Sequence, residues 1–322
     1  MADEAVATRA PENDAFDQGN VADSSGPPEH SGAMGEHCVS DRPTPTGEVP
    51  TGETTKLGDV DVYITKPADY PHAPSKLLLL LTSGTGIKST NNQLQADKFA
   101  AEGFLVIMPD QFDGDAAPNS VPEPVSPVQS FLEVFKMGIV DTAKSFMIDM
   151  WLARHTPEKV LPILHRVIAS AKEEFADAVA NGGGIYAVGY CFGAKYVLLL
   201  GSENPDSVLW GEEPTDEEQG MVKKGPFIKA GAVAHGTQIT PDEIAAVKVP
   251  ISLVCVDNDP LFPNEIREAG VEALEKNKVE HEVKVFPEVP HGFAVLGDYA
   301  DPKIKEAQRH AFGQMLGWLQ AH

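Results

Sequence analysis

The sequence predicts an α/β fold in which a mostly parallel, twisted sheet is covered by helices on both faces. Short runs of entirely apolar residues, such as 77–81 and 104–108, alternate along the chain with longer helix-like stretches. Strands that are apolar on both faces are typical of parallel sheets buried between helices. Ligands bind such sheets at the carboxyl ends of the strands, so this edge is where functional residues are expected.

The first predicted strand, 60–65, differs from the others because apolar Val60, Val62 and Ile64 alternate with more polar neighbours. This alternation is typical of a half-exposed edge strand. The other predicted elements follow in chain order. The predicted strands are 77–81, 104–108, 185–188, 229–234, 249–256 and 282–286, and the predicted helices are 93–102, 129–153, 159–180, 194–200, 262–278 and 303–319.

The first 50 residues differ in composition from the rest of the chain. They contain ten acidic residues against two arginines, with few large apolar side chains. Such a segment cannot bury enough surface to offset its ordering entropy, so we expect residues 1–50 to be a disordered acidic tail. Residues 51–322 are then predicted to form one α/β domain, which is long enough to bury a large core.

The charge of the chain excludes several classes of partner. Its 322 residues carry a formal net charge of −23, which repels nucleic acid and anionic membrane surfaces. The three cysteines do not make a disulfide framework, and the start of the chain lacks a secretory signal pattern. The longest apolar block, 77–81, is too short to span a bilayer. We therefore expect a cytoplasmic monomer or homodimer that binds a small molecule.

A short motif after the 185–188 strand carries the chemistry. Residues 189–193 read Gly-Tyr-Cys-Phe-Gly and are followed by a helix-like apolar run. A small–x–nucleophile–x–small pentapeptide between a strand and a helix is the nucleophile elbow of α/β-hydrolases, here with cysteine in place of serine. Glycine flanks the nucleophile because larger side chains would collide with the neighbouring strand and helix. The motif predicts that Cys191 is a nucleophile.

A cysteine nucleophile requires a general base, and the base requires a carboxylate that orients it. In α/β-hydrolases the chain order is nucleophile, acid, histidine. Asp259 follows the 249–256 strand and His291 follows the 282–286 strand. Both are therefore expected at the same sheet edge as Cys191.

Other residues compete for these roles. Asp257 is the alternative acid, although its position favours it less than Asp259. His235 follows the 229–234 strand and is the second candidate for the base, but it precedes the aspartate and so breaks the usual order. Cys255 lies in an apolar run and is interpreted as a buried core residue. No histidine or cysteine spacing suggests a metal site.

The combined motifs resemble the dienelactone hydrolase family. Gly189–Gly193, Asp259–Pro263 and His291–Ala294 carry the resemblance, and the segments 91–97 and 109–115 also resemble family segments. The similarity runs from about residue 51 to the C-terminus, and the style of the segments is that of fungal members. It implies an α/β-hydrolase fold and a cysteine nucleophile, with no cofactor.

The resemblance also implies individual roles. Cys191 would attack a lactone or ester carbonyl, His291 would take the thiol proton, and Asp259 would fix the histidine tautomer. The backbone N–H of Phe192 would be one oxyanion donor, and the second would come from the loop near Gly84. Residues suggested to line the pocket are Ser83, Tyr190, His235 and Phe293.

Two positions depart from the family pattern. Ser83 stands where many members carry an acidic residue, and Val295-Leu296 stand where an arginine often binds a substrate carboxylate. An apolar pair cannot bind a carboxylate, so a neutral lactone or ester is the expected substrate.

The sequence thus predicts a hydrolase of lactones or small carboxylic esters. Two alternatives stay open, because a fold does not determine a reaction. One is a non-hydrolytic enzyme on the same scaffold, such as a cyclase or dehydratase of secondary metabolism with His291 or His235 as base. The other is a catalytically silent ligand-binding protein.

Overall fold

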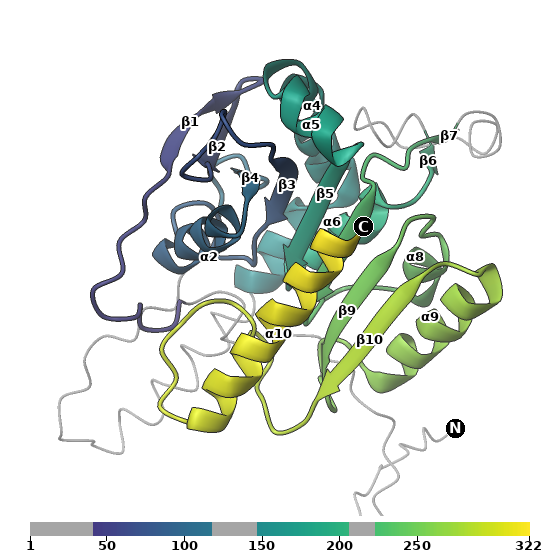
Figure 1. Cartoon of the computed structure of the whole chain (residues 1–322). Helices are drawn as coiled ribbons and strands as arrows, with labels where there is room; N and C mark the ends of the chain where they lie inside the picture. Colours follow the sequence, from purple (N-terminus) through teal and green to yellow (C-terminus); the bar gives the residue numbers. More distant parts are fainter. Residues whose placement is uncertain (1–40, 118–146, 206–222) are drawn as a thin grey trace, which may run out of the picture. The chain divides into compact units, whose positions relative to one another are not determined.

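The structure, a computed structural model, describes residues 41–117, 147–205 and 223–322. Within them, eight strands form one sheet in the order β1-β2-β4-β3-β5-β8-β9-β10 (Figure 1). The strands are β1 (Glu53–Leu57), β2 (Val60–Thr65), β3 (Lys76–Leu81), β4 (Phe104–Pro109), β5 (Ile185–Tyr190), β8 (Ala230–Ala234), β9 (Ile251–Val256) and β10 (His281–Phe286), with a separate small pair β6 (Asn204–Pro205) and β7 (Lys223–Lys224). The helices are α2 (Thr90–Ala101), α4 (Pro157–Glu174), α5 (Ala176–Gly182), α6 (Phe192–Leu200), α8 (Pro241–Ala245), α9 (Asn264–Asn277) and α10 (Pro302–Ala321).

The sheet is parallel from β4 to β10, and only β1 and β2 run antiparallel to their neighbours. Register places Leu81 of β3 opposite Gly189 of β5, and Tyr190 of β5 opposite Ala234 of β8. The carboxyl ends of these strands therefore meet at one edge, as the alternation of strands and helices predicts. The predicted fold class is confirmed.

Helices cover both faces of the sheet. The core on one face joins the strands to apolar residues of α4, α5, α6, α8 and α9. The core on the other face joins them to α2 and α10, the latter drawn in yellow across the sheet in Figure 1. Burial of β3, β4, β5, β8 and β9 on both sides explains why their sequences are almost wholly apolar.

The edge of the sheet differs from the prediction. β2 is not an edge strand, because β1 pairs with its outer side. Tyr63, at a position predicted to face solvent, is buried because its hydroxyl donates to Asp97 (2.8 Å) and accepts from the Gly52 N–H (2.7 Å). The predicted 159–180 helix is also two helices, α4 and α5, with a break at Phe175.

Two predictions fall wholly or partly outside the described residues. Of the expected 129–153 helix, only its end is described, and residues 147–154 are helical there. Of the expected acidic tail, residues 41–50 are described, and Asp41, Arg42 and Pro43 among them are hydrogen-bonded to the folded domain. None of the helices in the described ranges is long and apolar enough to cross a membrane.

Candidate active site

The elbow is a tight turn between β5 and α6. Cys191 adopts φ 51° and ψ −112°, a left-handed conformation that is costly for a side chain with a Cβ. A Cβ on Gly189 would lie 2.6 Å from the Gly193 carbonyl oxygen, and a Cβ on Gly193 would collide with the Leu81 carbonyl oxygen. Both glycines are therefore needed so that β5, α6 and the end of β3 pack closely around the cysteine.

The start of α6 supplies N–H groups near Cys191. A helix leaves its first amides without partners inside the helix. The Gly193 N–H donates to the Thr82 carbonyl (3.0 Å) and the Ala194 N–H to the Cys191 carbonyl (3.2 Å). Among the described residues, no backbone carbonyl accepts the Phe192 N–H, as expected of an oxyanion donor.

The loop that contains Ser83 and Gly84 lies beside the elbow. Its first residue, Thr82, accepts the Gly193 N–H described above, and the Gly84 carbonyl accepts the Ala117 N–H at 2.8 Å. The Ser83 hydroxyl is buried and bonds to the Thr85 hydroxyl at 3.0 Å. The Ser83 side chain is therefore engaged within its own loop, and the loop is fastened next to Cys191.

His291 and Asp259 form a buried pair at the same sheet edge. The Nδ1 of His291 lies 2.7 Å from the Asp259 Oδ2, and the Asp259 side chain is 0% exposed. The other carboxylate oxygen of Asp259 accepts the Leu261 N–H at 3.0 Å, which fixes the carboxylate after β9. Because Nδ1 is engaged with Asp259, the Nε2 of His291 is left for a second partner.

Nε2 is buried and hydrogen-bonds to no group among the described residues, and Cys191, which is fully buried, is the sulfur that acts electrostatically on this ring. Burial lowers the pKa of His291, but the hydrogen bond to Asp259 and the electrostatic interaction with Cys191 outweigh it and raise that pKa to about 9. His291 thus favours its protonated form when it faces both a carboxylate and a sulfur that can be a thiolate. The predicted residues Cys191, His291 and Asp259 are brought together.

The raised pKa makes a prediction about stability. The native state holds the His291 proton more tightly than the unfolded chain, where the histidine pKa is about 6.5. Its contribution is therefore complete below about pH 6.5, falls as pH rises toward about 9, and is absent above that. Guanidinium unfolding of the wild type and His291→Asn should give a stability difference that shrinks by at most about 3 kcal/mol over this window. A difference that grows with pH would contradict the protonated His291.

The second candidate base, His235, has a different setting. Its ring is completely buried and packs against the rings of His291 (centres 5.0 Å apart), Tyr190 (6.0 Å) and Phe293 (6.1 Å). Burial, helped by the charge on His291, holds the pKa of His235 well below its usual value, so its ring is neutral. The carboxylate that orients a base is paired with His291 instead. Tyr190, His235 and Phe293 form a buried layer behind the histidine.

The structure also decides the roles of the remaining candidates, Asp257 and Cys255. Asp257 is exposed and accepts a hydrogen bond from the Asn258 side chain (2.9 Å), so it is Asp259 that contacts His291. Cys255 is buried, as predicted, and burial raises the pKa of its thiol to about 12. In the ranges that the structure describes, no group of three or more histidine, cysteine or acidic residues could hold a metal ion.

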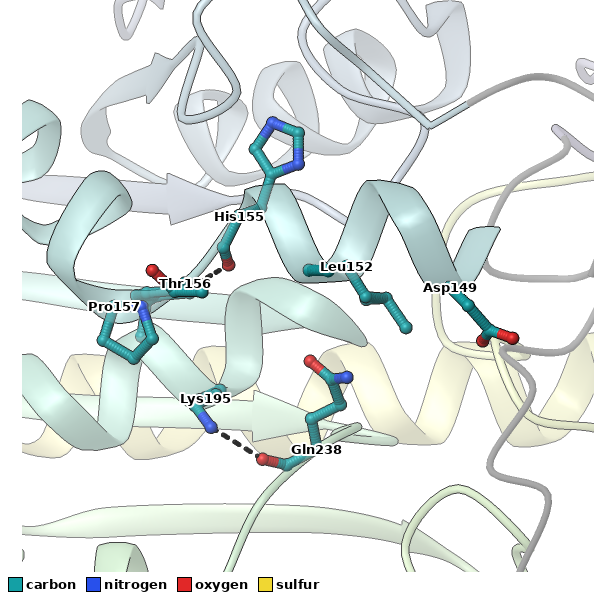
Figure 2. Close-up of a pocket in the computed structure, with 9 residues that line it drawn as sticks. Asp149, Leu152, His155, Thr156, Pro157, Lys195 and Gln238 are labelled. Carbon is teal, nitrogen blue, oxygen red and sulfur yellow. Dashed lines mark hydrogen bonds between the residues drawn. The ribbon is translucent and has the colours of Figure 1, made fainter. Parts of the chain in front are cut away.

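An aromatic cluster beside the elbow is absent from the sequence prediction. The ring of Phe192 lies 5.0 Å from Trp151 and 5.3 Å from Phe112. A pocket of about 510 Å³ (Figure 2) borders this cluster, because its lining includes His155, whose ring centre lies 4.6 Å from that of Trp151, and Tyr196, whose ring centre lies 5.1 Å from that of Phe192. The figure shows Lys195 reaching the backbone of Gln238 at its floor, with Asp149 at the far end. Only the spacing of Lys195 from Cys191, one helical turn, could have indicated this pocket.

Comparison with known proteins shows the family to which the chain belongs. The sequence pattern of the dienelactone hydrolase family matches residues 60–210 and 219–322. The chain belongs to the dienelactone hydrolase family. Membership of this family makes the protein a hydrolase. The match spans the elbow and the strands β9 and β10 that precede Asp259 and His291, and the family resemblance predicted from the sequence is confirmed.

Relatives of this family member include fungal proteins. Hydrolase pyvD of Aspergillus violaceofuscus is 31% identical over 84% of this chain and 90% of its own length. Hydrolase tropI of Talaromyces stipitatus is 28% identical over 85% of this chain and 91% of its own length. Dienlactone hydrolase 1 of Gibberella moniliformis is 26% identical over 84% and 87%.

Solved structures share the fold. A putative dienelactone hydrolase from Klebsiella pneumoniae superposes with a TM-score of 0.59 at 16% identity, over 84% of this chain and 99% of that one. An esterase from Thermogutta terrifontis superposes with a TM-score of 0.53 at 16% identity, over 82% and 91%. At these identities the likeness concerns the fold of this family member and not its substrate.

Proposed function

We propose that this family member hydrolyses a neutral lactone or small carboxylic ester through a thioester on Cys191. The observation that supports this most is the arrangement of His291, which bonds to Asp259 at 2.7 Å and is kept protonated by Asp259 and Cys191 together. A thiolate is the nucleophilic form of cysteine, and a nearby imidazolium stabilises it.

The first half of the reaction forms the thioester. The Cys191 sulfur attacks the substrate carbonyl carbon, and the carbonyl electrons move onto oxygen. The Phe192 N–H and an N–H of the loop at Gly84 would bind that oxyanion. When the tetrahedral intermediate collapses, the bond to the leaving oxygen breaks and protonated His291 gives that oxygen its proton.

The second half releases the acid. His291, now neutral, takes a proton from water, and the resulting hydroxide attacks the thioester carbonyl. Collapse expels the Cys191 thiolate and leaves a carboxylic acid. Asp259 holds the His291 ring in the tautomer that presents Nε2 first to the leaving oxygen and then to water. It also stabilises the positive charge of the protonated ring in both halves of the reaction.

The charges around the site support a neutral substrate. Lys195, one turn after Cys191, is paired with Glu243 at 2.9 Å and donates to the Gln238 carbonyl. Arg154, next to the aromatic cluster, is paired with Asp115 at 2.8 Å. Leu296 stands at a position where the family often offers an arginine, and it is buried. These cations are already engaged, so a substrate carboxylate gains no partner from them.

The test compares a carboxylate-bearing dienelactone with its own methyl ester and with p-nitrophenyl acetate. We expect the neutral compounds to be hydrolysed at least about tenfold faster in kcat/KM, because an unpaired carboxylate costs more than about 1.4 kcal/mol to bury. Equal or faster turnover of the free carboxylate would overturn the substrate assignment. Ligand binding without hydrolysis of any ester would overturn the reaction itself and favour a non-hydrolytic enzyme or a binding protein.

A further inference from the structure

The described chain begins with a segment that lies against two loops at once. We name residues Asp41–Pro43 the N-terminal strap. In Figure 1 the dark purple start of the described chain runs beside α2 and the yellow loop before α10. The sequence predicts disorder here because residues 1–50 are acidic and contain few large apolar side chains, and yet the Arg42 and Pro43 carbonyls are hydrogen-bonded.

The strap is bonded on one side to the start of α2. The Ser89 hydroxyl donates to the Asp41 carboxylate at 2.7 Å, and the Asn91 side-chain amide donates to the Arg42 carbonyl at 2.7 Å. Ser89 is also the residue that caps α2, since its hydroxyl oxygen accepts the Asn92 N–H. These residues directly follow the loop that carries Gly84.

On its other side the strap is bonded to the loop that follows His291. The Asp298 N–H donates to the Pro43 carbonyl at 2.8 Å, and the Arg42 guanidinium lies 5.0 Å from the centre of the Tyr299 ring. Gly297 packs so closely that a Cβ there would lie 2.5 Å from the Arg42 Cβ. Arg42 of the strap therefore packs directly against the backbone of Gly297, and no side chain fits between the two residues.

Both loops belong to the proposed active site. The Thr85 hydroxyl, next to Gly84, accepts from the Asn92 side chain at 2.9 Å, which couples the oxyanion loop to the α2 start. The loop 291–299 begins with the histidine itself and is otherwise tied to α2 by the Leu296 N–H, which donates to Gln95 at 3.0 Å. The strap is thus a second connection between the oxyanion loop and the histidine loop.

We propose that the N-terminal strap is a positioning segment of the active site, which sets the distance between the oxyanion loop and His291. This inference rests on the proposed function, because it assigns the strap to the same reaction. An error of about 1 Å in the placement of reacting groups can lower a rate by about 100-fold, so a connection of this kind has a measurable effect on turnover.

Gly297→Ala in the full chain tests the strap directly. Gly297 is not among the residues with positive φ, so its backbone accepts alanine, and the new methyl group would displace Arg42. We expect kcat for a neutral ester to fall about tenfold with KM little changed. Amide hydrogen exchange in residues 85–92 and 291–299 should become faster. Gly313→Ala is the matched control, since nothing lies within 4 Å of a Cβ at that position.

The decisive experiment introduces Gly297→Ala into the Arg42→Gly variant. It removes the Cβ with which the new methyl group collides and keeps the Arg42 and Pro43 carbonyls that bond to Asn91 and Asp298. In the double variant we expect kcat and exchange to return to the values of Arg42→Gly alone. If Gly297→Ala fails to fold, Asn91→Ala loosens the strap without a collision, because it removes the amide that bonds to the Arg42 carbonyl, and faster exchange is expected in both loops.

The outcomes separate the strap from the reaction. Unchanged exchange in Gly297→Ala, or an equal loss of kcat in the Arg42→Gly background, would overturn the strap while Cys191-dependent hydrolysis still stands. Faster exchange in both loops that Arg42→Gly reverses supports the strap connection even if the wild type hydrolyses no ester, in which case the proposed function alone fails.

Discussion

Cys191→Ala is expected to lower kcat for a neutral aryl ester by at least about 10⁴-fold, because it removes the atom that forms the covalent intermediate. The backbone donors at Phe192 and near Gly84 would remain and give at most a small residual rate. Stopped-flow or steady-state release of p-nitrophenol measures the loss. Intact mass spectrometry of the quenched wild type should find one acyl group, and the variant should carry none.

Cys255→Ala is the matched control for this experiment. Its thiol is also buried, but its pKa of about 12 leaves it protonated at neutral pH, and it packs in the core. The variant should keep the wild-type rate and the single acyl group. Hydrolysis that persists in Cys191→Ala but is lost in Cys255→Ala would reverse the assignment of the nucleophile.

Asp259→Asn should have the second largest effect, a loss of about 10⁴-fold in kcat. Asparagine can keep the bond from the Leu261 N–H through its carbonyl oxygen, so the loop after β9 should still form. It removes the charge that supports protonated His291 and permits the other ring tautomer. The pKa of His291 should therefore fall, and alkylation of Cys191 by iodoacetamide at pH 7 should slow in parallel.

Asp257→Asn is the comparison two residues earlier. The Asp257 side chain is exposed and accepts a hydrogen bond from the Asn258 side chain, so loss of its charge should leave both turnover and alkylation unchanged. If the two variants lose activity equally, the effect belongs to the loop as a whole and not to the carboxylate that faces His291.

The central strands and the elbow could be predicted from the sequence because their causes are local. Leu77–Leu81 is apolar throughout since both of its faces are covered, and Gly193 is glycine since the carbonyl of Leu81 leaves no room for a Cβ. The order of Asp259 and His291 after successive strands then places them at one edge. In a parallel sheet, residues that follow neighbouring strands lie at the same edge, so their positions in the sequence predict that they are close in space.

Other features could not be predicted because their causes are distant in the chain. β1 exposes four of its five residues and is held by backbone pairing with β2, which leaves no hydrophobic period. Tyr63 is polar in sequence but buried by a bond to Asp97, 34 residues away. Two of the bonds that fix the strap are accepted by the carbonyl oxygens of Arg42 and Pro43, and every residue type has a carbonyl oxygen.

The left-handed backbone of Cys191 places stability and chemistry in opposition at one residue. A non-glycine residue in such a conformation costs on the order of 1–3 kcal/mol, and glycine would relieve it. A selection for thermostability alone would therefore favour Cys191→Gly, which would stabilise the fold but remove the thiol of the nucleophile. In this fold, a substitution at the elbow that raises the melting temperature is expected to lower the activity.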